Sequence, residues 1–587
     1  MIDEAVVNKV FEKVKLRAGE VKRYPVSTYR LQFNRAFTFR DAAALVPYLH
    51  ELGITDIYAS PYLKAQPGSL HGYDITDHNS LNPEMGSEED YRSFVNQLHK
   101  HGMGQILDFV PNHMSIIDNP WWTDVLENGP SSPYAQFFDI DWYPVKAELR
   151  EKVLLPIMED QYGKILEGGQ LRLTFAHGAF FINYGEHTLP IDPRTAVLPL
   201  GACLEQLRET LGEGHPDFLE MESIIMACHN LPARNKIAQQ RVAERLRKKE
   251  VIKKRLWELY HRNEKVKKTL SEVLDVFNGN AGERRSFDKL HELLEQQAYR
   301  LSYWRVALDE INYRRFFDIN ELVAIQMENT HVFDLTHRLL NELLREGAAN
   351  GLRIDHIDGL FNPTEYLWRL QKARFLGLCW DEIEHDADLS GKNRDLWEEK
   401  LLERFEIERK LNPNSAITRP LFVIVEKILG EKEDLRETWP LDGTTGYEFA
   451  KVLNGIFINR RNARTLRNIY RWFTRMDEDF KDTAYRCKDL IMRTSMSAEV
   501  NVLAHRLDRV SEKSRWYRDF TRNNLRDAVR EVIACFPVYR TYIEAFENSV
   551  DDQDKTVISA AVAQAKRRNP AMSSSLFDFL RDTLLLK

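Results

Sequence analysis

The sequence predicts an α/β fold built on a parallel sheet, of the kind found in a (β/α)8 barrel. Strand-like and helix-like patterns alternate along the chain, which favours parallel strands joined by right-handed crossovers. Several predicted strands end in polar residues, and the carboxyl ends of barrel strands are where active sites are built. These polar residues are Tyr58, Asp108, Asn112, His113, Asp355 and Glu426.

Five stretches show the two-residue alternation or the apolar β-branched runs that are typical of strands. Helical patterns separate the first three of them, at residues 39–53 and 87–102, where apolar residues recur three and four positions apart. The five predicted strands are VSTYRLQF (26–33), ITDIYAS (54–60), GQILDFVPNH (104–113), GLRIDHIDGL (351–360) and LFVIVEKILG (421–430).

A long insertion is predicted between the third and fourth strands. More than two hundred residues separate His113 from Gly351, which is too many for one crossover helix. We therefore expect residues 114–345 to form an inserted subdomain, loop-rich at first and then helical. Residues 1–113 and 346–587 are expected to form the catalytic barrel, with a helical insertion at about 450–587.

One part of the insertion is strongly basic. Residues 234–268 contain 14 Lys or Arg against 4 Glu. Nucleic-acid binding is one interpretation of such a run. Apolar residues at helical spacing interrupt it, however, and this favours a solvated face of an amphipathic helix.

The bulk properties narrow the class of protein. A net charge of −7, 43% hydrophobic and 29% charged residues are typical of a soluble globular protein without a basic field for nucleic acid. The five cysteines lie far apart without CxxC spacing, which favours reduced thiols over disulfides or a zinc site. No apolar signal segment or membrane-length run is present. We expect a cytoplasmic protein with no metal, no cofactor, no nucleic-acid partner and no membrane partner.

The stretch GLRIDHIDGL carries the most informative pattern. Its alternation places Arg353 and Asp355 on the same face of a strand, where burying charge is costly. A buried structural ion pair is one explanation. A catalytic carboxylate that the neighbouring guanidinium keeps ionised is the other, and this motif alone leaves both open.

Four stretches taken in order resemble the motifs of the α-amylase superfamily (glycoside hydrolase family 13). They are HGYDITDHNSLNPEMG (71–86), DFVPNH (108–113), LRIDHID (352–358) and VIVEKI (423–428). From about residue 24 onward the chain also resembles the maltooligosyltrehalose synthase subfamily. That resemblance rests on PVSTYRLQF, GSLHGYDITD, YWRVALDEINYRRFFDINEL (303–322), GLRIDHIDGL and WPLDGTTGYEF (439–449).

The resemblance implies a role for each matching residue. Asp355 matches the nucleophile, and we expect Arg353 to lower the pKa of its carboxyl group by charge proximity. Glu426 matches the general acid/base, and retaining glycosidases hold these two carboxyl groups about 5–5.5 Å apart. The implied substrate-binding residues are Tyr73, Asp74, Asp108, Asn112, His113, Arg353 and His356.

The resemblance also implies an activity. It is an intramolecular transglycosylation that converts the reducing-end α-1,4 linkage of a maltooligosaccharide into an α,α-1,1 linkage, giving maltooligosyl trehalose. The enzyme class is an isomerase, (1→4)-α-D-glucan 1-α-D-glucosylmutase, coupled in trehalose biosynthesis to a trehalose-releasing hydrolase. The alternatives are an α-amylase-type hydrolase or glucanotransferase, and an inactive glucan-binding protein.

One expected feature of the superfamily is missing from the sequence. A third carboxylate, an Asp on a late strand, is not found, since His505 and Asp508 lie in a helical pattern. A sixth strand is predicted at TTGYEF (444–449), and the later patterns are helical. We therefore expect the barrel to be incomplete at its C-terminus and residues 1–587 alone to be inactive.

Overall fold

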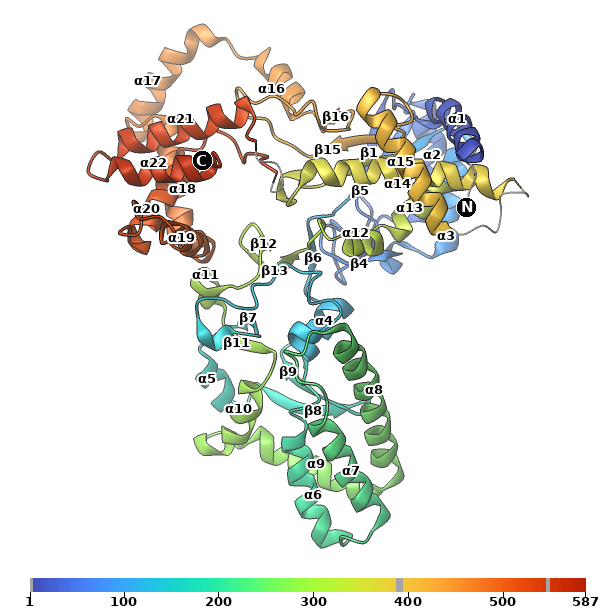
Figure 1. Ribbon diagram of the computed structural model, residues 1–587, viewed down its shortest axis with the longest axis vertical. Helices are drawn as coiled ribbons and strands as arrows, with labels where there is room; N and C mark the ends of the chain where they lie inside the picture. The colour runs from blue at the N-terminus through green and yellow to red at the C-terminus, as the bar shows by residue number, and fades with distance from the viewer. Residues whose placement is uncertain (1–3, 387–393, 545–548) are drawn as a thin grey trace. The chain divides into compact units, whose positions relative to one another are not determined.

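The computed structural model describes residues 4–386, 394–544 and 549–587 (Figure 1). The chain forms two compact units, which we describe separately. The first comprises residues 1–114, 325–494 and 500–587, and the second comprises residues 115–324 and 495–499. The first unit contains the predicted strands, and the second contains most of the predicted insertion.

The first unit is built on a six-stranded parallel sheet, a half-barrel with the order β1-β2-β5-β14-β15-β16. The α/β fold class and the five predicted strands are therefore confirmed. A sixth strand also forms, but it covers only two residues because α16 begins at Tyr447. The strands are β1 Thr28–Leu31, β2 Asp56–Ala59, β5 Gly104–Phe109, β14 Gly351–Ile354, β15 Phe422–Val425 and β16 Gly443–Thr444.

Helices connect these strands, and their start sites follow from the sequence. A capping box of Thr38 and Asp41 starts α2 (Phe39–Glu51), and another of Ser87 and Asp90 starts α3 (Glu88–Lys100). The other α-helices of this unit before β15 are α1 Glu4–Val21, α12 Thr330–Thr336, α13 Arg338–Arg345, α14 Pro363–Glu384 and α15 Arg394–Leu411. Helix α1 packs on α14 and α15 through a shared apolar core that includes Val10, Phe375 and Trp397.

Residues 325–345 belong to this first unit, because α12 and α13 pack beside β4 (Ile75–Leu81) and α14. The sequence placed them in the insertion. Strand β4 pairs antiparallel with β3 (Leu63–Ala65), and this pair holds the loop that carries Tyr73 and Asp74.

Helices follow β16, and no strand occurs among the described residues 446–544 and 549–587. Several of these helices share one apolar core, to which Leu525, Ile558 and Phe577 contribute. The helices are α16 Tyr447–Gly455, α17 Ala463–Thr474, α18 Phe480–Arg493, α19 Ser497–Ser511, α20 Arg522–Ala534, α21 Asp552–Arg568 and α22 Ser574–Leu584.

Helices α16 and α17 differ from the others because neither buries any residue. Each nevertheless carries apolar residues at the spacing of a core-facing helix. We call these two sets the apolar stripes. They consist of Phe449, Val452, Leu453 and Ile456 on or just after α16, and of Leu466, Ile469, Tyr470 and Phe473 on α17, all exposed.

The second unit combines small sheets with a helical layer. Its antiparallel sheet has the order β10-β9-β8, and β7 pairs in parallel with β11. The strands are β7 Val153–Met158, β8 Arg172–Ala176, β9 Ala179–Tyr184, β10 His187–Pro190, β11 Tyr299–Tyr303, β12 Arg315–Phe316 and β13 Ile319–Ala324. The helices are α4 Pro120–Asn128, α5 Tyr162–Glu167, α6 Val197–Thr210, α7 Pro216–His229, α8 Gln239–Arg262, α9 Glu264–Asn278, α10 Asp288–Glu295 and α11 Ala307–Glu310.

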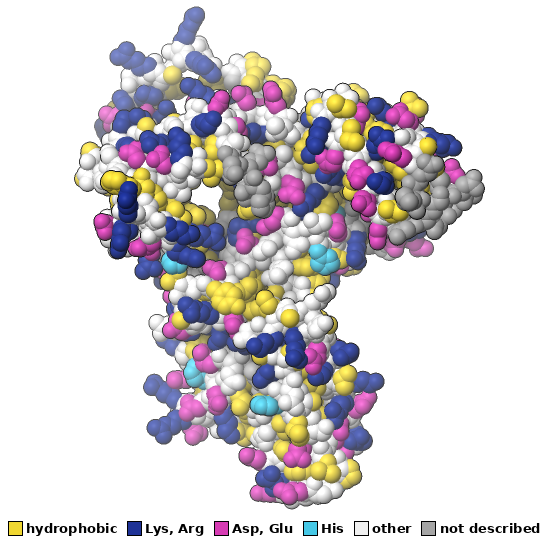
Figure 2. Space-filling model, in the orientation of Figure 1, with side chains coloured by type: hydrophobic (Ala, Val, Ile, Leu, Met, Phe, Trp, Pro, Cys, Tyr) yellow, Lys and Arg dark blue, Asp and Glu magenta, His cyan; other side chains and the backbone are white. Residues whose placement is uncertain are grey.

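The basic run predicted as a solvated face lies largely on α8, and that prediction is wrong for two of its residues. Arg245 and Lys249 are buried. Arg245 donates to Asp192 at 2.6 Å, and Lys249 donates to Glu127 at 2.6 Å. The buried carboxylates supply the countercharge that burial requires. Elsewhere on the face shown in Figure 2, basic and acidic side chains are interspersed.

None of the helices in the described part of the chain is both long enough and apolar enough to cross a bilayer.

Candidate functional site

The parallel register brings Asp355 and Glu426 to neighbouring positions. Ile354 of β14 is paired with Val425 of β15, so each carboxylate is the first residue beyond a strand end. The Glu426 amide donates to the Ile354 carbonyl at 2.9 Å, which extends the pairing by one step. Neighbouring strands lie about 4.8 Å apart. The two side chains therefore start from adjacent points at the carboxyl edge of the sheet.

Asp108 of β5 lies at the centre of a hydrogen-bonded cluster. Its Oδ2 accepts bonds from Tyr73 Oη at 2.7 Å and Tyr58 Oη at 3.1 Å. The same oxygen lies 3.4 Å from Arg30 Nη1. Its Oδ1 accepts from Arg353 Nη1 at 2.8 Å. Both oxygens of this buried carboxylate are thus satisfied, as a charge inside a protein requires.

Two members of this cluster, Arg30 and Tyr58, were not predicted as site residues. Arg30 pairs in register with Tyr58, and its guanidinium lies 4.8 Å from the centre of the Tyr58 ring. Tyr58 was recognised only as a polar strand end. The alternation in VSTYRLQF that placed Arg30 on one face of its strand was the available signal. Burial raises the pKa of the phenol groups of Tyr58 and Tyr73, and that of Tyr73 is raised to about 12.

The pKa of Asp355 is shifted in the opposite direction to our prediction. Arg353 Nη1 donates to Asp355 Oδ1 at 2.5 Å and favours the ionised form, as expected. Burial is the larger effect, however, and Asp108 and Glu426 add negative charge nearby. Together they raise the pKa of Asp355 to about 6. The sequence shows the charged neighbour but not the desolvation that outweighs it.

Asn112, His113 and His356 lie close to the same strand ends. Asn112 and His113 are buried, and Asn112 Nδ2 lies 3.3 Å from His113 Nδ1. His356 follows Asp355 and has a left-handed backbone with φ of 44°, a conformation that costs energy in a residue other than Gly. A Cβ atom on Gly359 would lie 2.3 Å from both Asn112 Oδ1 and His356 Cδ2. Only glycine therefore fits where the loop after β14 approaches Asn112.

Asp74 makes its described contacts within its own loop. Its Oδ1 accepts from Ser69 Oγ at 2.6 Å and lies 3.8 Å from His71 Nδ1. These contacts shape the turn that presents Tyr73 to Asp108. A contact between Asp74 and sugar remains a prediction.

A second charged network lies next to Glu426 in the sequence. The next residue, Lys427, is buried, with its Nζ 3.2 Å from Asp358 Oδ2 and 2.7 Å from Glu433 Oε1. Tyr542 Oη also donates to the Asp358 carboxylate. This network joins the loop after β14 to the loop after β15. No pattern in the sequence predicted it.

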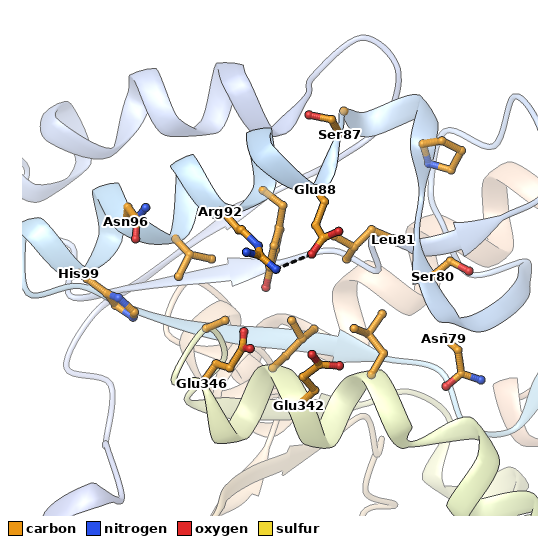
Figure 3. Close-up of a pocket in the computed structure, with 17 residues that line it drawn as sticks. Asn79, Ser80, Leu81, Ser87, Glu88, Arg92, Asn96, His99, Glu342 and Glu346 are labelled. Carbon is orange, nitrogen blue, oxygen red and sulfur yellow. Dashed lines mark hydrogen bonds and ion pairs between the residues drawn. The ribbon is translucent and has the colours of Figure 1, made fainter.

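A groove elsewhere in the first unit is not part of this site. It has a volume of about 880 Å³ and lies between α3 and α13 (Figure 3). Arg92 and Glu88 form an ion pair there, opposite Glu342 and Glu346. None of the clustered residues at the carboxyl ends of the strands lines it.

Comparison with known proteins identifies a related catalytic domain and related chains. Residues 43–169 match the family model of the α-amylase catalytic domain. A Mycobacterium tuberculosis protein assigned as a maltooligosyl trehalose synthase is 27% identical over 453 residues, which are 75% of this chain and 40% of that protein.

Two solved structures resemble most of the chain. The maltooligosyltrehalose synthase of Arthrobacter ramosus matches with a TM-score of 0.63 and 25% identity, over 96% of this chain and 53% of that one. A Sulfolobus tokodaii protein, described as a hypothetical maltooligosyl trehalose synthase, matches with a TM-score of 0.56 and 25% identity, over 96% of this chain and 54% of that one.

The relatives that match most of this chain are described as maltooligosyl trehalose synthases. The resemblance inferred from the sequence motifs is thus confirmed, and the half-barrel corresponds to the α-amylase catalytic fold. The chain spans 40% of the length of the M. tuberculosis protein and about half of the length of the two chains of known structure.

Proposed function

We propose that these residues contribute to an enzyme that forms maltooligosyl trehalose from maltooligosaccharides by intramolecular transglycosylation. The observation that carries the proposal is the adjacency of Asp355 and Glu426 across β14 and β15, beside the cluster around Asp108. The similarity to maltooligosyl trehalose synthases supports the same reaction. Release of trehalose from this product requires a partner hydrolase. We propose that both enzymes act in the cytoplasm.

The first step would form a covalent intermediate. A carboxylate oxygen of Asp355 attacks the anomeric carbon of the penultimate glucosyl unit, and the bond from that carbon to the glycosidic oxygen breaks. Glu426 gives its proton to the departing oxygen of the terminal glucose. Because the pKa of Asp355 is about 6, most of the nucleophile is ionised at neutral pH.

The second step would rejoin the two sugars through different atoms. The released glucose stays bound and turns its anomeric hydroxyl towards the intermediate. Glu426, now a base, takes the hydroxyl proton while the new α,α-1,1 bond forms and Asp355 leaves. Two inversions preserve the α configuration. Water has to be kept from the intermediate, since it would otherwise hydrolyse it.

The remaining clustered residues would hold the sugar that is cleaved. We assign Tyr73 to stacking on the ring, and Asn112, His113 and His356 to hydrogen bonds with its hydroxyl groups. Arg353 and Asp108 would fix the position of the nucleophile. Substrate positioning of this kind supplies a large part of catalysis by reducing the entropy lost in the transition state.

The decisive assay is incubation with maltopentaose while reducing ends and free glucose are followed together. It is run on residues 1–587 and on a chimera that adds the part of the A. ramosus synthase that this chain does not match. We expect the chimera to consume reducing ends with little glucose released, and its Glu426→Gln variant to leave them unchanged. A gain in reducing ends would favour an amylase-type hydrolase. No change in the chimera would favour a glucan-binding protein.

A further inference from the structure

A short segment between α20 and α21 lies against the loop that follows the proposed nucleophile. The Tyr539 ring centre is 5.8 Å from that of His356, and the two planes are nearly perpendicular at 88°. His356 directly follows Asp355. A residue from the helical part of the first unit therefore contacts the proposed sugar site.

The residues that flank Tyr539 are fixed to this loop. Arg540 Nη1 donates to the Asp358 carbonyl at 3.0 Å and to the Leu360 carbonyl at 2.6 Å. Two residues further along, Tyr542 donates to the Asp358 carboxylate. These bonds set the position of the backbone on the C-terminal side of Tyr539.

The Tyr542 side chain is itself held from several sides. Its ring packs edge-on against Trp439 at 4.9 Å. Lys427, which follows Glu426, lies 5.4 Å from the ring centre. The segment is therefore anchored to both loops that carry the proposed catalytic carboxylates.

Tyr539 differs from these neighbours because 57% of its surface is exposed. An exposed aromatic ring on an anchored backbone offers a flat apolar surface with a polar tip, and little freedom is lost when a ligand packs on it. The faces of a glucosyl ring are apolar and its edges are polar.

We propose that Tyr539 is a sugar-binding residue whose ring packs against a glucosyl unit of the substrate beside His356. The inference rests on the proposed function, since it takes the ligand to be a maltooligosaccharide. Arg540 and Tyr542 are positioning residues, because they act on sugar binding by orienting the segment that carries Tyr539.

The test is the affinity of residues 1–587 for maltopentaose, measured by calorimetry without any need for turnover. Tyr539→Ala should weaken binding about tenfold, since an aromatic stacking contact and its buried area contribute on the order of 1–2 kcal/mol. Tyr539→Phe and Tyr539→Trp should bind within about twofold of the unaltered chain, because stacking needs the ring. Tyr542→Phe, which keeps its ring and loses only its bond to Asp358, should weaken binding less than Tyr539→Ala.

Trp516→Ala is the matched control, because Trp516 is a strongly exposed aromatic residue of the same unit. It should leave affinity unchanged, and the Tyr539 and Trp516 variants should unfold at the temperature of the unaltered chain. Equal affinity of Tyr539→Ala and the unaltered chain would overturn the inference alone. Binding that depends on Tyr539, with no trehalose linkage formed by the chimera, would overturn the proposed reaction alone. A failure of the unaltered chain to bind maltopentaose would overturn the inference, whereas turnover by the chimera would still support the reaction.

Discussion

Arg353 donates a 2.5 Å hydrogen bond to Asp355, yet the pKa of that carboxyl group is raised to about 6. The guanidinium divides its charge between two acids, since the same Nη1 also donates to Asp108 at 2.8 Å. Burial and the neighbouring acids outweigh its effect on Asp355. The Arg353–Asp355 pair therefore holds the carboxylate in place without making it a strong acid.

The raised pKa of Asp355 predicts how stability varies with pH. An ordinary aspartate has a pKa of 3.8, and that of Asp355 is about 6 when folded, so the folded state binds the proton more tightly. The stability that this tighter proton binding adds to the folded state is complete below about pH 4 and is lost as the pH rises through 6. Asp355→Asn removes this titration. Relative to the wild type, its free energy of unfolding at pH 8 should therefore be higher, compared with that at pH 4, by about 2–3 kcal/mol. Urea unfolding at both pH values tests this, with the exposed Asp552→Asn as control. Parallel pH curves for wild type and Asp355→Asn would contradict it.

Glu426→Gln should separate binding from catalysis. The amide keeps the size of the side chain but cannot exchange a proton, and general acid/base catalysis contributes about 10²–10⁴-fold to rate. We expect turnover by the chimera to fall by that factor while maltopentaose affinity is nearly unchanged. Glu431→Gln is the control, because Glu431 is exposed in the loop after β15. Turnover like that of the wild type in Glu426→Gln would remove Glu426 from the mechanism.

A fluorinated glucosyl donor should label Asp355. The retaining route passes through a glycosyl ester on the nucleophile, and fluorine slows its breakdown enough for isolation. Peptide mapping of the labelled chimera should place the adduct at residue 355, and Asp355→Asn should take up no label. An adduct on Asp358 or Asp108 would assign the nucleophile to that residue instead.

Lys427→Met should destabilise the first unit strongly. The substitution removes the cation between Asp358 and Glu433, whose carboxylates lie 3.2 and 2.7 Å from it. Breaking a buried ion pair from one side costs about 3–5 kcal/mol. Denaturant unfolding measures the loss, and Lys432→Met, at an exposed position, should cause little change. Equal midpoints for the two variants would show that Lys427 contributes no more than a surface charge.

The apolar stripes of α16 and α17 predict dye binding by the folded chain. Their residues leave a large apolar surface in water, which is the kind of surface that ANS binds. The double variant Val452→Lys, Phe473→Lys should lower ANS fluorescence without lowering the free energy of unfolding, because neither side chain is buried. Leu16→Lys, at an isolated exposed leucine on α1, should leave the fluorescence unchanged. Weak ANS binding by the unaltered chain would contradict the prediction.

The sequence predicted the strands because their β-branched and alternating residues form a local signal. It also placed Asp355 and Glu426 at strand ends, since each directly follows an apolar run. It did not show that β1 lies beside β2 with Arg30 opposite Tyr58, because register depends on partners that are distant in sequence. Arg30 was missed for that reason.

Three other differences have the same origin. The pKa of Asp355 depends on burial by surrounding side chains, and the contacts of Lys427 include Tyr542, more than one hundred residues away. Residues 325–345 were assigned to the insertion because a helix pattern does not reveal which unit its apolar face packs against. The local sequence pattern identifies helices and strands. Tertiary contacts decide the charge state of a buried side chain and the unit to which a helix belongs.

The cluster around Asp108 also constrains how related sequences diverge. Asp108 faces two guanidinium groups and two phenols, so its loss would leave Arg353 with one acid partner and Arg30 with none at this site. A relative that replaces Asp108 by a neutral residue should therefore carry a compensating change at Arg353 or Arg30. Across an alignment of such relatives, these three positions should covary as a group, and Tyr58 and Tyr73 should vary more freely, since each supplies only a hydroxyl donor.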